Sequence, residues 1–226
     1  MSELATAAKL ERTVASYSLF PTRIYQAPLS FVKGLEPRRA NRLRKELERD
    51  ALVIREIDED GHIWSETNYR GGFTSYGSLD TLHAQFPPFG ELEKYLDRHV
   101  LKFAKLQNWD LQGGGLKMVS CWVNIMPAGA AHSLHLHPLA VVSGTFYVST
   151  PKGTSPIKFE DPRLDKFMAQ PPRHPRAPRT EQPFFEIQPK TGDVVLFESW
   201  LRHEVPTVPL EAKHERISIS FNYDWV

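Results

Sequence analysis

From residue 116 to residue 226 the chain is a succession of short strand patterns with no helical pattern between them. Turn-forming groups such as Pro127-Ala128-Gly129 and Pro151-Lys152-Gly153 separate these patterns. We predict strands at residues 116–125, 132–137, 141–149, 157–160, 184–188, 194–199 and 216–223. A parallel sheet needs a crossover, usually a helix, between successive strands. The pattern therefore favours a β-barrel or a double-sheet jelly roll.

The first half of the chain has a helical pattern instead. Residues 17–26 read as an extended segment, and Pro37 opens a predicted helix that runs to Leu52. Glycines break the pattern across residues 61–78, so we expect no helix there and a structured loop at 68–75. A second helix is predicted from about residue 78, interrupted at Pro87-Pro88 and resuming to Leu106. The expected fold is mainly β with N-terminal helices.

Length and charge limit the classes of protein to consider. The 226 residues, 41% of them hydrophobic, suffice for one large domain, with a support at residues 17–115 and a barrel at 116–226. Twenty-eight Lys and Arg residues against 27 Asp and Glu residues give a formal net charge of +1. Such a balance gives no reason to expect a nucleic acid or an anionic membrane as partner.

The expected compartment follows from the cysteine content and from the N-terminus. Cys121 is the single cysteine and has no partner for a disulfide within the chain, which favours a reducing cytoplasm. Residues 1–13 mix charged residues with alanines and do not resemble a signal peptide. No uncharged apolar segment reaches the ~18 residues of a membrane span. We therefore expect a soluble, cytoplasmic protein, and the sequence leaves its oligomeric state open.

Residues 163–183 interrupt the strand pattern with five prolines and several arginines. Such a long segment without apolar periodicity is typical of a functional lid or of a disordered insert. The sequence leaves both alternatives open.

Histidines on the predicted strand 132–137 indicate a metal site. Because side chains alternate along a strand, His135 and His137 are expected on one face, and His132 on the other with a role at the rim of the site. A third histidine, His203, follows the strand 194–199. Imidazole nitrogens are standard ligands for Fe, Zn, Cu and Ni, so these three residues are candidate ligands.

The last predicted strand adds a candidate anion site. Arg216 and Ser218 share one of its faces, and we expect His203, thirteen residues upstream, on the neighbouring strand. An arginine can bind a carboxylate through two parallel hydrogen bonds. The alternative is an ion pair between Arg216 and one of the acids of the chain.

These motifs, in this order, resemble the 2-oxoglutarate and Fe(II)-dependent oxygenases, and more closely a bacterial and phage group of them with an H-x-H-P motif and a double-stranded β-helix. The similar segments are residues 122–125, His135-Leu136-His137-Pro138, Ser143-Gly144-Thr145-Phe146-Tyr147-Val148, residues 159–163, 192–197, 200–203 and 216–222, with a weaker match at 68–75.

The resemblance implies roles for individual residues. His135 and His203 correspond to the two histidines that hold iron, and Arg216 with Ser218 to the anchor for the far carboxylate of 2-oxoglutarate. Tyr147 falls where related enzymes place a hydroxyl on the same carboxylate, and Asn124 would line the pocket. The implied reaction uses O2, releases succinate and CO2, and hydroxylates a small-molecule or peptide substrate. It needs no acid or base from the protein.

The chain departs from the wider family at His137, where most members have an acid. Three histidines leave Fe(II) with a charge of +2, which the dianion of 2-oxoglutarate would neutralise. Alternatively, His137 does not bind, and water, Asp161 or Glu160 takes the third position. Two other functions stay open: a three-histidine cupin-type dioxygenase or isomerase that does not use 2-oxoglutarate, and a non-catalytic metal-binding sensor.

Overall fold

A computed structural model gives the structure of residues 18–226, so the prediction for residues 1–13 lies outside the described part. Ten strands are found there: β1 (Tyr25–Pro28), β2 (Phe73–Thr74), β3 (Leu116–Met126), β4 (His132–His135), β5 (Val142–Ser149), β6 (Ile157–Glu160), β7 (Phe184–Ile187), β8 (Asp193–Glu198), β9 (His203–Val205) and β10 (Arg216–Trp225). All seven predicted strands are present. The sequence pattern did not predict the short strands β2 and β9.

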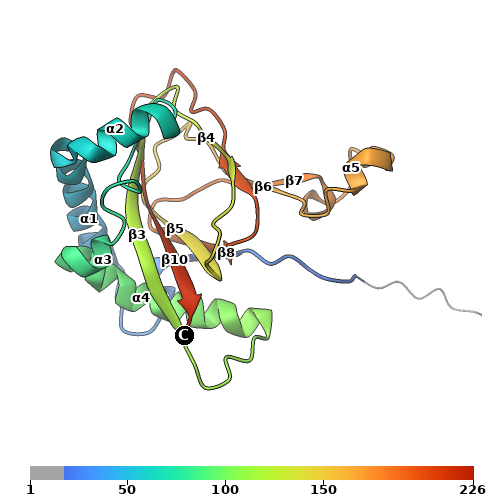
Figure 1. Ribbon diagram of the computed structural model, residues 1–226, viewed down its shortest axis with the longest axis horizontal. Helices are drawn as coiled ribbons and strands as arrows, with labels where there is room; N and C mark the ends of the chain where they lie inside the picture. Colours follow the sequence, from blue (N-terminus) through green and yellow to red (C-terminus); the bar gives the residue numbers. More distant parts are fainter. Residues whose placement is uncertain (1–17) are drawn as a thin grey trace, which may run out of the picture.

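The strands form two antiparallel sheets that face each other (Figure 1). The larger sheet has the order β1-β8-β5-β10-β3-β2, and the smaller has the order β4-β9-β6-β7. From β3 to β10 the chain thus passes back and forth between the two sheets, except that β6 and β7 pair within the smaller one, which is the winding of a double-stranded β-helix. This confirms the predicted fold class.

Helices cover the outer face of the larger sheet (Figure 1). They are α1 (Pro37–Ile57), α2 (Glu59–Asn68), α3 (Leu82–Gln85) and α4 (Pro87–Gln107), with a short 3-10 turn at Leu29–Phe31. Leu43, Leu47, Ala51 and Ile54 of α1 join one apolar core with the outward-facing residues of β3, β5 and β10. Because this core fixes one face of the larger sheet, the opposite face of the same strands is left to line a site between the sheets.

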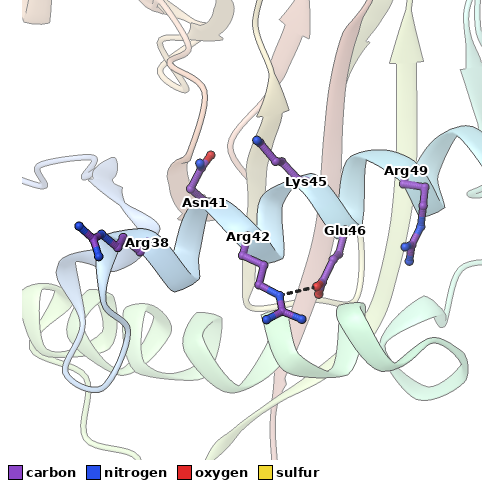
Figure 2. A pocket seen from close by; sticks show the side chains of 6 residues that line it. All are labelled: Arg38, Asn41, Arg42, Lys45, Glu46 and Arg49. Atoms are coloured by element: carbon purple, nitrogen blue, oxygen red, sulfur yellow. Dashed lines mark hydrogen bonds and ion pairs between the residues drawn. The ribbon is translucent and has the colours of Figure 1, made fainter.

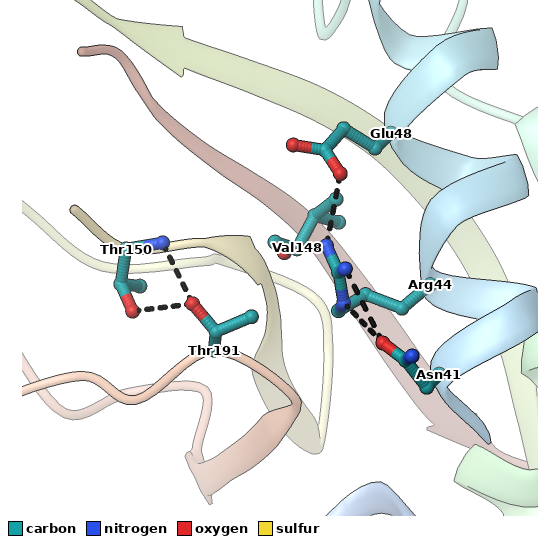
Figure 3. Close-up of polar contacts among 6 residues, drawn as sticks. All are labelled: Asn41, Arg44, Glu48, Val148, Thr150 and Thr191. Carbon is teal, nitrogen blue, oxygen red and sulfur yellow. Dashed lines mark hydrogen bonds and ion pairs between the residues drawn. The ribbon is translucent and has the colours of Figure 1, made fainter. Parts of the chain in front are cut away.

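Polar contacts fasten α1 to the end of β5 (Figure 3). The Arg44 guanidinium donates to the backbone oxygen of Val148 at 3.0 Å and to Glu48 of its own helix at 2.9 Å. Thr150, just after β5, is held to Thr191, which precedes β8, by two hydrogen bonds of 2.8 and 3.0 Å. The Arg44 contact connects the helical support to the barrel, and the threonine pair connects β5 to the loop before β8.

The prediction of no helix across residues 61–78 is wrong, because α2 runs through Gly61. The Asp58 carboxylate caps this helix by accepting a hydrogen bond from the Gly61 N–H at 2.9 Å. A Cβ at position 61 would collide with that same carboxylate, so this glycine permits the cap and does not end a helix. The predicted loop at 68–75 is a turn that leads into β2.

The insert between β6 and β7 contains a short helix, α5 (Lys166–Ala169), and a 3-10 turn (Arg179–Glu181). In Figure 1 it extends away from the two sheets. Its base is held by Asp161, which forms ion pairs of 2.9 Å with both Arg163 and Lys166. The insert is thus anchored beside β6 and reaches outward from the barrel.

Candidate metal centre

Three histidines from separate backbone segments converge between the two sheets. His135 ends β4, His203 begins β9 directly opposite it in the ladder, and His137 lies in the loop after β4. One ligand atom from each lies within 4.8 Å of the others, and among residues 18–226 this is the one group of His, Cys, Asp and Glu side chains that meets this criterion. The strand predicted to reach His137 ends at His135. The two side chains nevertheless converge as expected.

The second nitrogen of each histidine is already occupied. Nδ1 of His135 lies 2.7 Å from the Ser133 backbone oxygen, and Nδ1 of His203 lies 2.9 Å from that of Leu201. A carbonyl oxygen can only accept, so in both rings the proton is on Nδ1 and the Nε2 lone pair is free. Such outer partners fix the tautomer and orientation of metal-binding histidines in general.

His137 obtains the same tautomer from a side chain. Its Nδ1 lies 2.7 Å from Asn222 Oδ1, which also accepts from the Ser143 hydroxyl at 2.7 Å, while Asn222 Nδ2 donates to Ser120 Oγ at 3.0 Å. These bonds fix the amide so that its oxygen faces the ring. The sequence reading assigned Asn222 no role, although the residue lies on the same face of the last strand as Arg216.

Burial keeps the histidines in the neutral form that binds metal. It lowers the pKa of His137 to about 4, with neighbouring His135 as a further cause, and it lowers the pKa of His135. For His203, burial followed by His135 and His137 places the pKa well below its usual value. At neutral pH no proton competes with a cation at this cluster.

His132 lies beside the pair and not on the opposite face. Its ring stacks on that of His135, with the centroids 4.0 Å apart, and contacts the Tyr69 ring on its other side at 4.7 Å. The prediction of an opposite face is wrong because the β4–β9 register shifts between His132 and His135.

The two acids considered as alternative ligands are engaged elsewhere. Asp161 pairs with Arg163 and Lys166, and Glu160 pairs with Arg202 at 3.0 Å. Neither belongs to the cluster around the histidines. In the described part of the chain, His137 is the residue that lies close to His135 and His203, and neither acid does.

At the start of β10, Arg216 forms a second polar centre. It is 3% exposed, its Nη1 lies 3.3 Å from Ser218 Oγ, and its guanidinium carbon lies 5.1 Å from the centre of the Tyr147 ring. The prediction that the strand of His203 neighbours that of Arg216 is wrong: β9 belongs to the smaller sheet, and β10 pairs with β3 and β5 in the larger one. The two residues therefore come from opposite sheets.

Three buried polar atoms at this end have no hydrogen-bond partner: Arg216 Nε, the Tyr147 hydroxyl and Asn124 Oδ1. None of the ion pairs in the described structure involves Arg216, so the alternative of an internal ion pair is not supported. Burial raises the pKa of Tyr147, and the Arg216 charge partly offsets the rise. A neutral hydroxyl and a guanidinium whose Nε has no partner are both donors, and together they fit a carboxylate.

Comparison with known proteins finds a matching family. Residues 120–222 match the family described as "Putative 2OG-Fe(II) oxygenase". These residues form a 2-oxoglutarate–Fe(II) oxygenase domain. The cofactors of this oxygenase are accordingly Fe(II) and 2-oxoglutarate, and the His cluster and the Arg216 centre are chemically suited to them.

The oxygenase is also similar in fold to solved structures. A prolyl-4-hydroxylase from Pseudomonas putida is 16% identical over 91% of this chain and 94% of that one, with a TM-score of 0.57. HygX from Streptomyces hygroscopicus, solved with nickel and 2-oxoglutarate, is 13% identical over 90% of this chain and 83% of its own, with a TM-score of 0.54. A viral collagen prolyl hydroxylase from Paramecium Bursaria Chlorella virus-1 is 12% identical over 90% and 96%, with a TM-score of 0.53.

No curated protein matches the chain. Within residues 18–226 no helix has the length and apolar character to cross a membrane.

A concave region lies on α1, and its chemistry differs from that of the histidine site (Figure 2). It is lined by Arg38, Asn41, Arg42, Lys45, Glu46 and Arg49. Arg42 pairs with Glu46 at 3.0 Å, and Arg49 with Asp50 at 2.8 Å, so much of the positive charge is neutralised locally. This surface contains no histidine and is a solvated helix face.

Proposed function

We propose that His135, His137 and His203 hold Fe(II) through their Nε2 atoms and that Arg216 binds the far carboxylate of 2-oxoglutarate. The observation that carries the proposal is the pairing of an Nδ1-anchored histidine triad with a buried Arg216, on the facing sheet, whose Nε has no hydrogen-bond partner. Ser218 and the Tyr147 hydroxyl would complete the carboxylate site, and Asn124 would line the space between.

When bound, Fe(II) and 2-oxoglutarate supply the oxidising chemistry: O2 is consumed, succinate and CO2 are released, and one oxygen atom enters a C–H bond of the substrate. The residues of the chain bind, orient and exclude water. Phe197 and Phe159, both buried, pack on the His203 ring with centroids 4.5 and 5.9 Å away. They keep the imidazole in place and water away from one side of the ligand set.

Charge supports the match between the two sites. Three neutral imidazoles leave the full +2 of Fe(II), and Arg216 adds a further positive charge at the other end of the cavity. A dicarboxylate with two negative charges neutralises the metal and pairs with the guanidinium at once, which a monocarboxylate cannot do.

An anaerobic titration tests the proposal. The full-length protein loaded with Fe(II) should develop the visible absorption of a keto acid chelated to iron on addition of 2-oxoglutarate, and admission of O2 should yield succinate. Pyruvate, which has the keto acid but no far carboxylate, is the matched control and should bind far more weakly. Metal-loaded protein that does not bind 2-oxoglutarate would refute the proposal.

The same titration separates the alternatives. The three-histidine ligand set is also that expected of a cupin-type dioxygenase or isomerase, in which Arg216→Met would leave turnover intact. A sensor would gain thermal stability from metal and consume no O2 with any substrate.

Further parts of the proposal rest on the sequence alone. We infer a single domain over residues 1–226, a cytoplasmic location consistent with the buried free thiol of Cys121, and a small-molecule or peptide substrate. A nucleic-acid partner is not expected from the charge balance.

A further inference from the structure

Exposed apolar side chains gather around one of the three proposed ligands, His137. We define the apolar rim as Tyr76, Leu139 and Trp200, with Trp122 beneath them. Tyr76 is 46% exposed, Leu139 98% and Trp200 45%, whereas Trp122 is buried. Large apolar side chains near a proposed reaction centre mark a binding surface more often than scattered ones do.

Tyr76 reaches this place by way of the edge strand β2. The backbone after β2 continues along β3, since the Ser75 N–H donates to the Val123 oxygen at 3.1 Å. The Tyr76 ring then lies 5.0 Å from that of Trp122, which in turn lies 5.7 Å from the His137 ring. The helical half of the chain thereby supplies Tyr76, which is connected to the histidine cluster through the ring of Trp122.

Trp64 fixes Tyr76 from behind. Its ring makes an edge contact with Tyr76 at 5.7 Å, and it packs directly against the backbone of Gly77, where any Cβ would collide with the indole. The aromatic row therefore has little freedom to rearrange. A rigid aromatic surface loses little conformational entropy on binding a ligand.

Leu139 and Trp200 approach His137 from the loops. The His137 N–H donates to the Ser199 oxygen at 3.0 Å, which places the residue after Ser199, Trp200, beside the ligand. Leu139 follows His137 by two residues and has a left-handed backbone conformation, with φ at 65°, which is unfavourable for a residue with a Cβ. That backbone turns an apolar side chain into solvent next to the proposed metal.

We propose that the primary substrate of this oxygenase presents an uncharged apolar group, aromatic or aliphatic, that packs on the apolar rim while its reacting carbon faces the metal. This rests on the proposed function and adds the substrate class. The rim is continuous with the ligand set through Trp122 and the His137 loop.

The charged side chains of the insert and of α1, and that of Arg202, do not compete for this role. The Arg-rich insert extends away from the barrel in Figure 1, and the basic side chains of α1 lie on the helix that covers the outer face of the larger sheet. Arg202, two residues after Trp200, is paired with Glu160. An anionic or cationic group at the rim would therefore lose hydration without gaining a free countercharge from these residues.

The test uses defined probes, because the natural substrate is unidentified. Full-length protein is loaded with 2-oxoglutarate and with Zn(II), which is redox-inert. Ligand-observed NMR then measures the binding of the N-acetylated amides of leucine, phenylalanine and proline, and of those of glutamate and lysine. The apolar amides should bind at least about tenfold more tightly than the charged ones, as expected for burial of one apolar side chain. Tyr76→Ala and Trp200→Ala should each weaken this binding about tenfold, and Leu139→Ala about threefold.

Two exposed residues elsewhere provide matched controls. Trp225→Ala and Leu210→Ala remove a tryptophan and a leucine of comparable exposure and should leave probe binding unchanged. Equal effects of rim and control variants, or tighter binding of the charged amides, would overturn the proposal. So would a dimer in sedimentation that Tyr76→Ala or Trp200→Ala converts to monomer, since the rim would then be covered by a second copy. If Zn(II) and 2-oxoglutarate themselves fail to bind, the proposed function fails instead, and this is known before any probe is added.

Discussion

The two ends of the site between the sheets differ in how far their hydrogen bonds are complete. At the end that we propose binds the metal (the metal end), each of His135, His137 and His203 has its Nδ1 bonded to an acceptor at 2.7–2.9 Å. At the end that we propose binds 2-oxoglutarate (the cosubstrate end), Arg216 Nε and the Tyr147 hydroxyl are buried without a partner. The metal end is thus organised by the protein alone, whereas the cosubstrate end is completed only by a ligand.

This difference has an energetic meaning. A buried polar group without a partner costs about 1–3 kcal/mol, and more if it is charged. The protein carries that cost at Arg216 and Tyr147 in the absence of cosubstrate, and a carboxylate removes it on binding. Metal affinity should therefore depend on ligand number and orientation, and cosubstrate affinity on satisfying donors that are already desolvated.

The largest expected effect is on the metal end. His135→Ala and His203→Ala should each weaken Fe(II) or Co(II) binding roughly a thousandfold or more, since the ligands of a structural metal site together supply about 10–16 kcal/mol. Competition with a chromophoric chelator measures the change. His174→Ala, on the exposed insert, is the control. His137→Ala should match the other two; full affinity in that variant would mean that the protein supplies only two ligands.

At the cosubstrate end, Arg216→Met should leave metal binding intact and weaken 2-oxoglutarate at least about a hundredfold, because two charge-assisted hydrogen bonds of about 1.5–3 kcal/mol each are lost. Anaerobic titration of the Fe(II)-loaded protein gives the dissociation constant. Arg202→Met removes an arginine that pairs with Glu160 and should have no such effect. Equal loss in both variants would mean that Arg216 acts through general charge.

The sequence specified the barrel and the candidate residues better than the details of their placement. Strand alternation correctly placed Arg216 and Ser218 on one face of β10, where Arg216 Nη1 lies 3.3 Å from Ser218 Oγ, because the pairing with β3 has no register shift between these residues. It failed for His132, because a register shift in the short strand β4 has no sequence signal. It also gave no role to Asn222, since a hydrogen bond between residues 85 positions apart, such as Asn222 with His137, depends on the packing of the two sheets.

The pH dependence of the metal-free protein tests the burial of the histidines. Because the folded-state pKa of His137 is lowered to about 4, the unfolded chain takes up a proton below pH 6.5 and the folded protein does not. The free energy of unfolding should therefore fall as pH drops from 6.5 to 4, by up to about 3 kcal/mol from this residue. Urea unfolding in chelator at pH 7, 5.5 and 4.5 measures the fall, and His137→Gln should flatten it. A variant with an unchanged slope would contradict the assignment to His137.

A smaller effect is expected where the metal end relies on a side chain and not on the backbone. Asn222→Leu should weaken metal binding about 10–100-fold, the usual cost of losing an outer-shell partner, because the His137 ring is no longer held. Asn222→Asp retains an acceptor and should restore most of the affinity. The absorption spectrum of the Co(II)-loaded protein should change only in the leucine variant. A loss of thermal stability without a change in spectrum or affinity would give Asn222 a purely structural role.

The smallest expected effect separates the two ends most directly, because it should have opposite signs with and without ligand. Tyr147→Phe removes one unpaired hydroxyl, so the protein without cosubstrate should become more stable by about 1 kcal/mol, the cost of a buried unsatisfied group. The same change removes a donor to the carboxylate and should weaken 2-oxoglutarate about tenfold. Urea unfolding with and without 2-oxoglutarate measures both. The control is Tyr25→Phe. The Tyr25 hydroxyl is bonded to His99 at 2.8 Å, so its removal should lower stability in both conditions. If Tyr147→Phe is destabilising without cosubstrate, its hydroxyl already has a partner, and the cosubstrate end is as complete as the metal end.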